Sequence, residues 1–179
     1  MTSLQKNILI TGLPGTGKTT LIRKVAAELR LLSPCGFFTQ EIRERGVRKG
    51  FALSSLDGTT RVLAHVDLAG PFRVGKYGVD VAGFEDFLGS LPLTGIAGRI
   101  IILDEIGKME CLSERFRGIV TSLLDSPAPM LATIALRGTG FIEQFKRRPD
   151  VALIEITERS RERLAGVIVE RICALRDAP

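Results

Sequence analysis

The residues best suited to chemistry stand close together near the amino terminus. They fit the pattern GxxxxGK[ST] and read Gly12, Leu13, Pro14, Gly15, Thr16, Gly17, Lys18 and Thr19. Glycines let the backbone bend so that successive N–H groups face phosphate oxygens, and a helix that starts after the loop favours the same negative charge. Lys18 is then expected to reach the β- and γ-phosphates, and the Thr19 hydroxyl to join the shell of a Mg²⁺ ion. This segment predicts a cradle for a magnesium nucleoside triphosphate.

A pair of carboxylates supplies the second half of the predicted site. The apolar run 99–103 is followed directly by Asp104 and Glu105, and ligands of open α/β sheets sit at the carboxyl ends of strands. Asp104 is expected to hold Mg²⁺ through water, and Glu105 to orient or deprotonate an attacking water. The alternative is an ordinary solvated acidic turn. Beside a phosphate loop, the two carboxylates favour hydrolysis.

A third strand end carries a basic residue. The apolar run 130–136 is interpreted as an extra strand inserted between the strands of the two motifs, and Arg137 follows it. Arg137 could touch the γ-phosphate and stabilise charge in the transition state, or it could be a solvated loop arginine.

The elements that must position these residues alternate along most of the chain. Apolar periodicity predicts strands at 7–11, 99–104, 130–136 and 151–156, and helices at 18–32, 83–91, 113–124, 141–147 and 160–175. Glycine-broken alternation predicts strands at 36–41, 50–55, 61–66 and 73–81, and residues 92–98 are expected to form a loop. The pattern predicts an α/β three-layer sandwich around a mostly parallel sheet, with an antiparallel hairpin excursion at its edge. Residues 1–179 are expected to form a single domain.

Composition narrows the class of protein further. The 179 residues are 45% hydrophobic and 25% charged, and the longest apolar runs are far below the roughly 18 residues that a membrane span requires. Cys35, Cys111 and Cys173 are widely spaced and are interpreted as free thiols. A cytoplasmic monomer is the default expectation. The net charge of +5 favours anionic ligands; a nucleic acid remains possible, although no long basic run supports it.

Further segments carry a resemblance to a known family. They are residues 12–20, 36–43 (GFFTQEIR), 50–51, 74–79 (VGKYGV), 104–110 (DEIGKME) and 156–161. Together they resemble the small cytosolic P-loop nucleoside-triphosphatases found from thermophilic bacteria and archaea to humans. The chain departs from the family pattern at Gln40, Cys111 and Ser160, where Glu, Leu and Asn are usual, and none of these removes a phosphate or metal ligand.

The resemblance implies hydrolysis of ATP, GTP, CTP and UTP to the diphosphate and phosphate. It places the nucleotide beside the acidic strand and its continuation, namely Ile101, Ile102, Leu103, Asp104, Glu105, Ile106, Gly107 and Lys108. By the same comparison Glu110 lies beside the nucleotide; alternatively it caps the next helix. Lys108 is likewise expected beside the nucleotide, and the alternative is a charge on the protein surface. Thr39, Glu41 and Arg43 lie on one face of a strand, which is either near the phosphates or exposed to solvent. Tyr77 either packs within the protein or stacks on the base of the nucleotide.

Two other functions are compatible with these residues. A kinase would use residues 35–98 to hold a small-molecule acceptor, but the arginines of that segment are dispersed and form no compact lid: Arg43, Arg45, Arg48 and Arg61. A nucleotide-gated module that binds RNA or a protein is suggested by the basic charge, and a steep salt dependence of oligonucleotide affinity would favour it.

Overall fold

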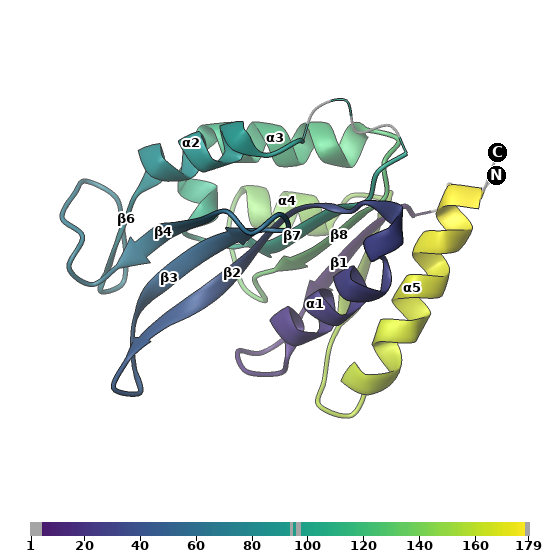
Figure 1. The fold of residues 1–179 in the computed structure, drawn as a ribbon, viewed down its shortest axis with the longest axis horizontal. Coiled ribbons are helices and arrows are strands. Elements are labelled where there is room, and N and C mark those ends of the chain that lie inside the picture. Colours follow the sequence, from purple (N-terminus) through teal and green to yellow (C-terminus); the bar gives the residue numbers. More distant parts are fainter. Residues whose placement is uncertain (1–4, 94, 96–97, 178–179) are drawn as a thin grey trace.

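The fold is built on one nine-stranded sheet. The computed structural model describes residues 5–93, 95 and 98–177, and the strand order is β5-β6-β4-β3-β2-β7-β8-β1-β9 (Figure 1). Five neighbouring strands form its parallel half: β2 (Cys35–Glu44), β7 (Ile101–Ile106), β8 (Met130–Ile134), β1 (Asn7–Thr11) and β9 (Val151–Glu155). β8 separates β7 from β1, so the extra strand between the two motif strands is confirmed.

The other half of the sheet is the antiparallel excursion. It comprises β3 (Val47–Ser55), β4 (Thr60–His65), β5 (Arg73–Val74) and β6 (Tyr77–Val79). The stretch predicted over 73–81 divides into two strands, because Val74 pairs with Tyr77 across a two-residue turn that contains Gly75 at φ 57°. A positive φ at this turn position suits glycine, so the chain reverses there and forms a hairpin.

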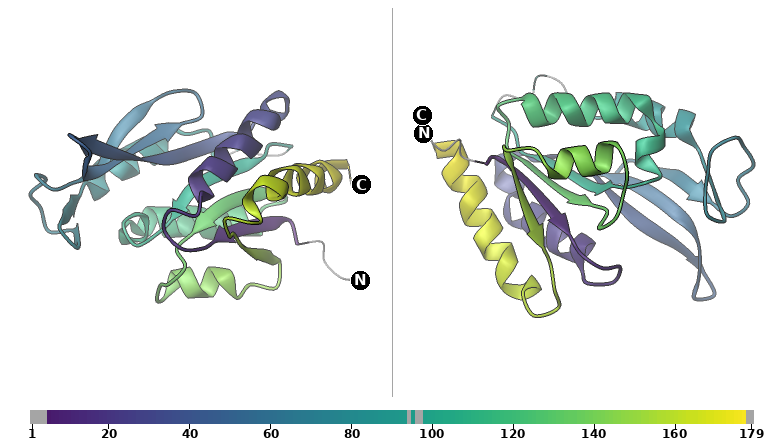
Figure 2. Two further views of the ribbon diagram at one scale, coloured as in Figure 1. Left: turned by 90° about the horizontal axis from the view of Figure 1, so that it is seen from below. Right: turned by 180° about the vertical axis from the view of Figure 1, so that it is seen from behind.

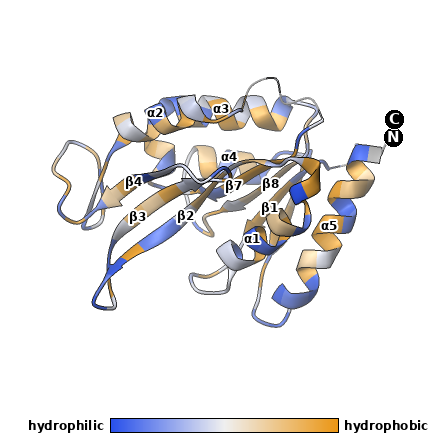
Figure 3. Cartoon of the chain, viewed as in Figure 1, coloured by the Kyte–Doolittle hydropathy of each residue, from blue (hydrophilic) through white to orange (hydrophobic). Residues whose placement is uncertain are grey.

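Helices cover both faces of the sheet (Figure 2). One face packs against α1 (Lys18–Glu28) and α5 (Arg161–Asp177), and the other against α2 (Val81–Ser90), α3 (Glu114–Asp125) and α4 (Phe141–Lys146). Side chains along β1 point alternately to the two faces of the sheet, so the core has two parts. Ile8 and Ile10 face α1 and α5, and Leu9 faces the helices on the other side. Figure 3 shows the apolar residues concentrated on the central strands. The predicted three-layer α/β fold is confirmed.

Some boundaries differ from the predicted ones in ways that affect the site. The helix predicted over 18–32 ends at Glu28 and a short 3-10 turn, Arg30–Leu32, follows it. β7 continues to Ile106, so the two carboxylates lie within the strand rather than after it. The loop predicted at 92–98 lies partly outside the described residues. Across the described part of the chain, no helix is long and apolar enough to cross a membrane.

Candidate active site

The phosphate loop connects the carboxyl end of β1 to the amino end of α1. At Gly12 the backbone has φ 152°, and an added Cβ would stand 2.8 Å from the carbonyl oxygen of Ile156, so close packing also requires glycine there. Gly17, at φ 94°, is the N-cap residue of α1 and has no side chain with which to cover the helix end. The first N–H groups of α1 are therefore open to an anionic ligand.

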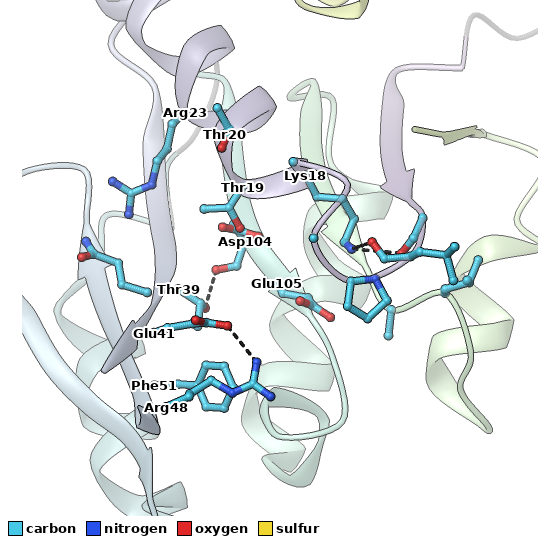
Figure 4. Close-up of a pocket in the computed structure, with 18 of the residues that line it drawn as sticks. Lys18, Thr19, Thr20, Arg23, Thr39, Glu41, Arg48, Phe51, Asp104 and Glu105 are labelled. Carbon is cyan, nitrogen blue, oxygen red and sulfur yellow. Dashed lines mark hydrogen bonds and ion pairs between the residues drawn. The ribbon is translucent and has the colours of Figure 1, made fainter. Parts of the chain in front are cut away.

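Lys18 holds its amine over this loop. Its Nζ donates to the carbonyl oxygens of Gly12 at 3.0 Å and Leu13 at 3.1 Å. Figure 4 shows the side chain curled toward the loop rather than extended into solvent. A cation and a set of N–H groups therefore converge on the same volume, the arrangement that binds phosphate.

Asp104 is a buried carboxylate with one free oxygen. The residue is 1% exposed; Oδ1 accepts a hydrogen bond of 2.6 Å from Thr133 Oγ1, whereas Oδ2 has no hydrogen-bond partner among the described residues. Burial raises the pKa of Asp104 above its ordinary value, and the hydrogen bond from Thr133, the nearby Thr19 hydroxyl and the charge of Arg23 oppose that rise. A buried oxygen of this kind suits a metal-bound water or a cation.

Glu105 follows directly and points into the cavity. It lies between Lys18 and the side chains of β2 and β3 in the view of Figure 4. Burial raises its pKa, the negative charge of Asp104 raises it further, and the positive charge of Lys18 lowers it. A carboxylate with a raised pKa is a better proton acceptor, which suits general-base chemistry.

The cavity between these groups extends well past the phosphate loop. Its volume is about 910 Å³ and it is lined on one side by residues 12–15 and 17–20 and on the other by β2 and β3. The sequence indicates this second wall only weakly, because Thr39 and Glu41 equally fit a solvated sheet face and nothing in the sequence marks Arg23, Arg48 or Phe51 as site residues. The available signal was the polar alternation along β2, but the pairing of β2 with β7 is needed to place it beside Asp104.

Several residues predicted to contact nucleotide lie elsewhere. Ile101, Ile102, Leu103 and Ile106 are fully buried in the core, because β7 is covered by helices on both faces. Lys108 lines a neighbouring hollow with Cys111 and residues 137–142.

The remaining predicted positions have clear surroundings. Arg137 lines both the main cavity and the neighbouring hollow. Gly107 packs against the carboxylates of Glu110 and Glu105, since a Cβ there would stand 2.8 Å and 3.1 Å from their oxygens. The prediction that Glu110 caps the next helix is wrong, because Ser113 is the N-cap residue of α3 and accepts the Phe116 N–H at 3.0 Å.

Tyr77 follows the packing interpretation rather than base stacking. It is buried, its ring centroid is 5.3 Å from that of Phe51, and its hydroxyl accepts a hydrogen bond of 3.1 Å from Arg48 Nε.

The fold and the site define a P-loop NTPase-like α/β protein. A family model described as NTPase matches residues 7–169. The chain is 45% identical over 164 residues to nucleoside-triphosphatase THEP1 of Thermotoga sp. (strain RQ2), covering 90% of this chain and 92% of the relative. It is 35% identical over 184 residues to the cancer-related nucleoside-triphosphatase of Homo sapiens, covering 93% and 96%. The crystal structure of THEP1 from Aquifex aeolicus superposes with a TM-score of 0.82 at 31% identity, covering 93% of this chain and 98% of that chain. The chain therefore belongs to this NTPase family.

Proposed function

We propose that this protein hydrolyses nucleoside triphosphates to the diphosphate and phosphate in a magnesium-dependent reaction. The observation that carries the proposal is the placement of Glu105 and Asp104 on the cavity that the phosphate loop and Lys18 also line, with Asp104 Oδ2 unpaired among the residues that the structure describes. The names of the relatives as nucleoside-triphosphatases support the same reaction. Residues 12–19 would hold the triphosphate.

The donor set fits Mg²⁺. No group of three or more His, Cys, Asp or Glu side chains gathers as a metal site in the described ranges, so an all-protein cage is not built there. Magnesium keeps several waters and is commonly bound by one or two protein oxygens plus substrate phosphates. The Thr19 hydroxyl and the free oxygen of Asp104 are such donors. The bound ion would neutralise charge on the β- and γ-phosphate oxygens.

The side chains then have separate tasks in hydrolysis. Glu105 accepts a proton from the attacking water as the water oxygen bonds to the γ-phosphorus. The bond from that phosphorus to the oxygen bridging to the β-phosphate breaks, and the diphosphate keeps that oxygen. Lys18 leaves the loop carbonyls to stabilise the charge on the β- and γ-phosphates.

Every nucleoside triphosphate carries the same triphosphate group, so each could make the same contacts with the protein. The groups assigned to binding face the phosphates, and none of them reads a base. We therefore propose activity toward ATP, GTP, CTP and UTP. The relatives' names, which specify no base, are consistent with that breadth.

The first test measures phosphate release from the four triphosphates with Mg²⁺ and no acceptor. Glu105→Gln should lower the rate by about a hundredfold or more while still binding nucleotide, because it loses only the proton acceptor. Lys18→Ala should lose both binding and turnover. Glu170→Gln, on the exposed face of α5, is the matched control and should behave as the parent.

Two outcomes would contradict the assignment. Parental turnover by Glu105→Gln would remove its role as base. Loss of triphosphate only when a small-molecule acceptor is added would favour the kinase alternative over hydrolysis.

A further inference from the structure

The proposed function leaves the nucleoside half of the substrate without a partner. The residues assigned to binding so far contact the phosphates or the metal ion, and none of them touches the sugar or the base. The order of the strands indicates where the nucleoside leaves the phosphate loop. This step rests on the proposed function, because it takes the triphosphate to lie on that loop.

The strand order gives the direction in which the bound nucleotide lies. In P-loop proteins the γ-phosphate faces the metal ligand and the residue that positions the attacking water, here Asp104 and Glu105 on β7. β1, which leads into the phosphate loop, has β8 and then β7 on one side and β9 on the other. With the γ-phosphate on the β7 side, the α-phosphate and the nucleoside lie toward β9 and the start of α5.

The phosphate loop and the segment that joins β9 to α5 lie side by side (Figure 1 and Figure 2). The Ile156 N–H donates to the Thr11 carbonyl oxygen at 2.8 Å, which continues the pairing of β9 with β1 up to the loop. Ile156 also closes over Gly12, where a Cβ would stand 2.8 Å from the Ile156 carbonyl oxygen. The first residues of α5 are therefore held beside the phosphate loop.

Arg161, the first residue of α5, lies against the last glycine of the loop. Its Cδ and Nη1 atoms are 3.6 Å and 3.8 Å from the point where a Cβ of Gly17 would stand. The backbone of Arg161 is fixed, because its N–H donates to the Thr157 carbonyl oxygen at 3.1 Å. Ser160 and Thr157 also exchange backbone-to-hydroxyl hydrogen bonds of 3.0 Å and 3.3 Å, which hold this corner of the chain. The side chain is thus placed where α1 begins.

The Arg161 guanidinium is available to a ligand. Within the described part of the chain its one ion-pair partner is Glu162, at 3.6 Å between two exposed side chains. Such a surface pair contributes little free energy, so a ligand can replace it at low cost. The Arg161 side chain is 48% exposed, and a planar, weakly hydrated guanidinium is suited to stacking on aromatic rings, nucleotide bases included.

We propose that Arg161 binds the nucleoside end of the substrate by stacking its guanidinium on the face of the base. Every base presents such a face, so the contact holds purines and pyrimidines without reading the hydrogen-bonding groups at their edges. It is therefore compatible with the proposed activity toward four triphosphates. Arg161 touches neither the γ-phosphate nor the attacking water, so it contributes to affinity and not to the chemical step.

The test compares two ligands that differ at the nucleoside end. Calorimetric titration with Mg²⁺ follows AMPPNP, a non-hydrolysable triphosphate, in one arm and inorganic tripolyphosphate, which has no nucleoside, in the other. Arg161→Gln should weaken AMPPNP binding about fivefold, the loss expected for a cation stacked at an exposed site, and leave tripolyphosphate within about twofold of the parent. Retained tripolyphosphate binding also shows that the variant is folded and its phosphate loop intact.

Two further variants make the test specific. Arg161→Lys keeps the positive charge but lacks the planar group, so it should recover little of the lost AMPPNP affinity. Arg163→Gln is the matched control, because Arg163 is exposed in the same turn of α5 but two positions away, on a different side of the helix. It should bind both ligands as the parent does.

The phosphate-release assay gives a second readout. Arg161→Gln should raise the KM for ATP by a similar factor and leave kcat within about twofold of the parent, since the contact is made equally before and during the reaction.

The outcomes separate this inference from the proposed function. Failure of both ligands to bind the parent would contradict the proposed function and the nucleoside contact with it. Parental AMPPNP affinity in Arg161→Gln would overturn the nucleoside contact alone. Equal losses for AMPPNP and tripolyphosphate, or full recovery in Arg161→Lys, would also overturn it, because the contact would then be to phosphate and not to the base.

Discussion

Glu110 gives the sharpest prediction, because it is an acidic residue sealed inside the protein. It lies in the 3-10 turn after β7 and is 5% exposed. Burial raises its pKa to about 8, and the negative charges of Glu105 and Asp104 add to the rise. The neighbouring Cys111 thiol has a pKa near 12 and does not titrate in the same range. At neutral pH the folded protein therefore keeps a proton on Glu110.

The consequence for stability has a definite sign. In the unfolded chain a glutamate has a pKa of about 4.3, so between about pH 4.3 and 8 the folded state binds one proton more than the unfolded state. The free energy of unfolding must then fall as pH rises through this window, by up to about 1.4 kcal/mol per pH unit from this group. The decline ends above pH 8, where both states are ionised.

Glu110→Gln tests this reasoning, because an amide of nearly the same shape cannot ionise. Urea unfolding of the parent and the variant at pH 5, 6, 7 and 8 gives the difference in slope, and that difference isolates Glu110 from Asp104 and Glu105, which remain in both proteins. We expect the variant to lose most of the decline and to be the more stable of the two at pH 8. Glu114→Gln, at a side chain 91% exposed on α3, is the control and should keep the parental slope. Equal slopes in the parent and Glu110→Gln would refute the argument.

Other substitutions test the packing and the site. Gly36→Ala should lower the free energy of unfolding by about 3 kcal/mol or more in urea, because its Cβ would stand 1.8 Å from the Ile102 carbonyl oxygen at φ 136°; near-parental stability would contradict the close packing. Gly118→Ala, at an exposed position of α3 where a Cβ meets nothing within 4 Å, should instead raise the free energy of unfolding by about 0.5–1 kcal/mol; a lower stability would be the contrary result. Thr133→Val removes the donor to Asp104 Oδ1 and should cost about 1–3 kcal/mol and raise the Mg²⁺ concentration needed for half-maximal phosphate release; an unchanged Mg²⁺ requirement would separate Thr133 from the proposed metal site.

The amino-acid sequence was sufficient for the features whose chemistry is local. The phosphate loop is one contiguous segment, and its function depends on backbone N–H groups that glycine spacing and the following helix already indicate. The α/β class and a strand over 130–136 followed from the alternation of apolar periods. The place of that strand between the two motif strands was expected from the arrangement of P-loop enzymes that carry a catalytic glutamate. The division of 73–81 into two strands escaped prediction, because the reversal depends on one glycine within a segment that otherwise alternates like a strand.

Side-chain direction was decided only by the tertiary structure. The family resemblance implied nucleotide contacts for Ile101 to Leu103, but their strand is covered on both faces and all three side chains lie in the core. The position of Glu110 in the sequence likewise did not predict that its side chain is buried and protonated.

The second wall shows the same limit most clearly. Arg48 and Phe51 are more than fifty residues from Asp104 in the sequence, and β2 brings them to it by pairing with β3 along one edge and with β7 along the other. The groups proposed to bind phosphate belong to one short contiguous motif, so the sequence alone was enough to identify them. Long-range strand pairing decided what faces them, because such contacts depend on the register between segments and not on the residues within either one.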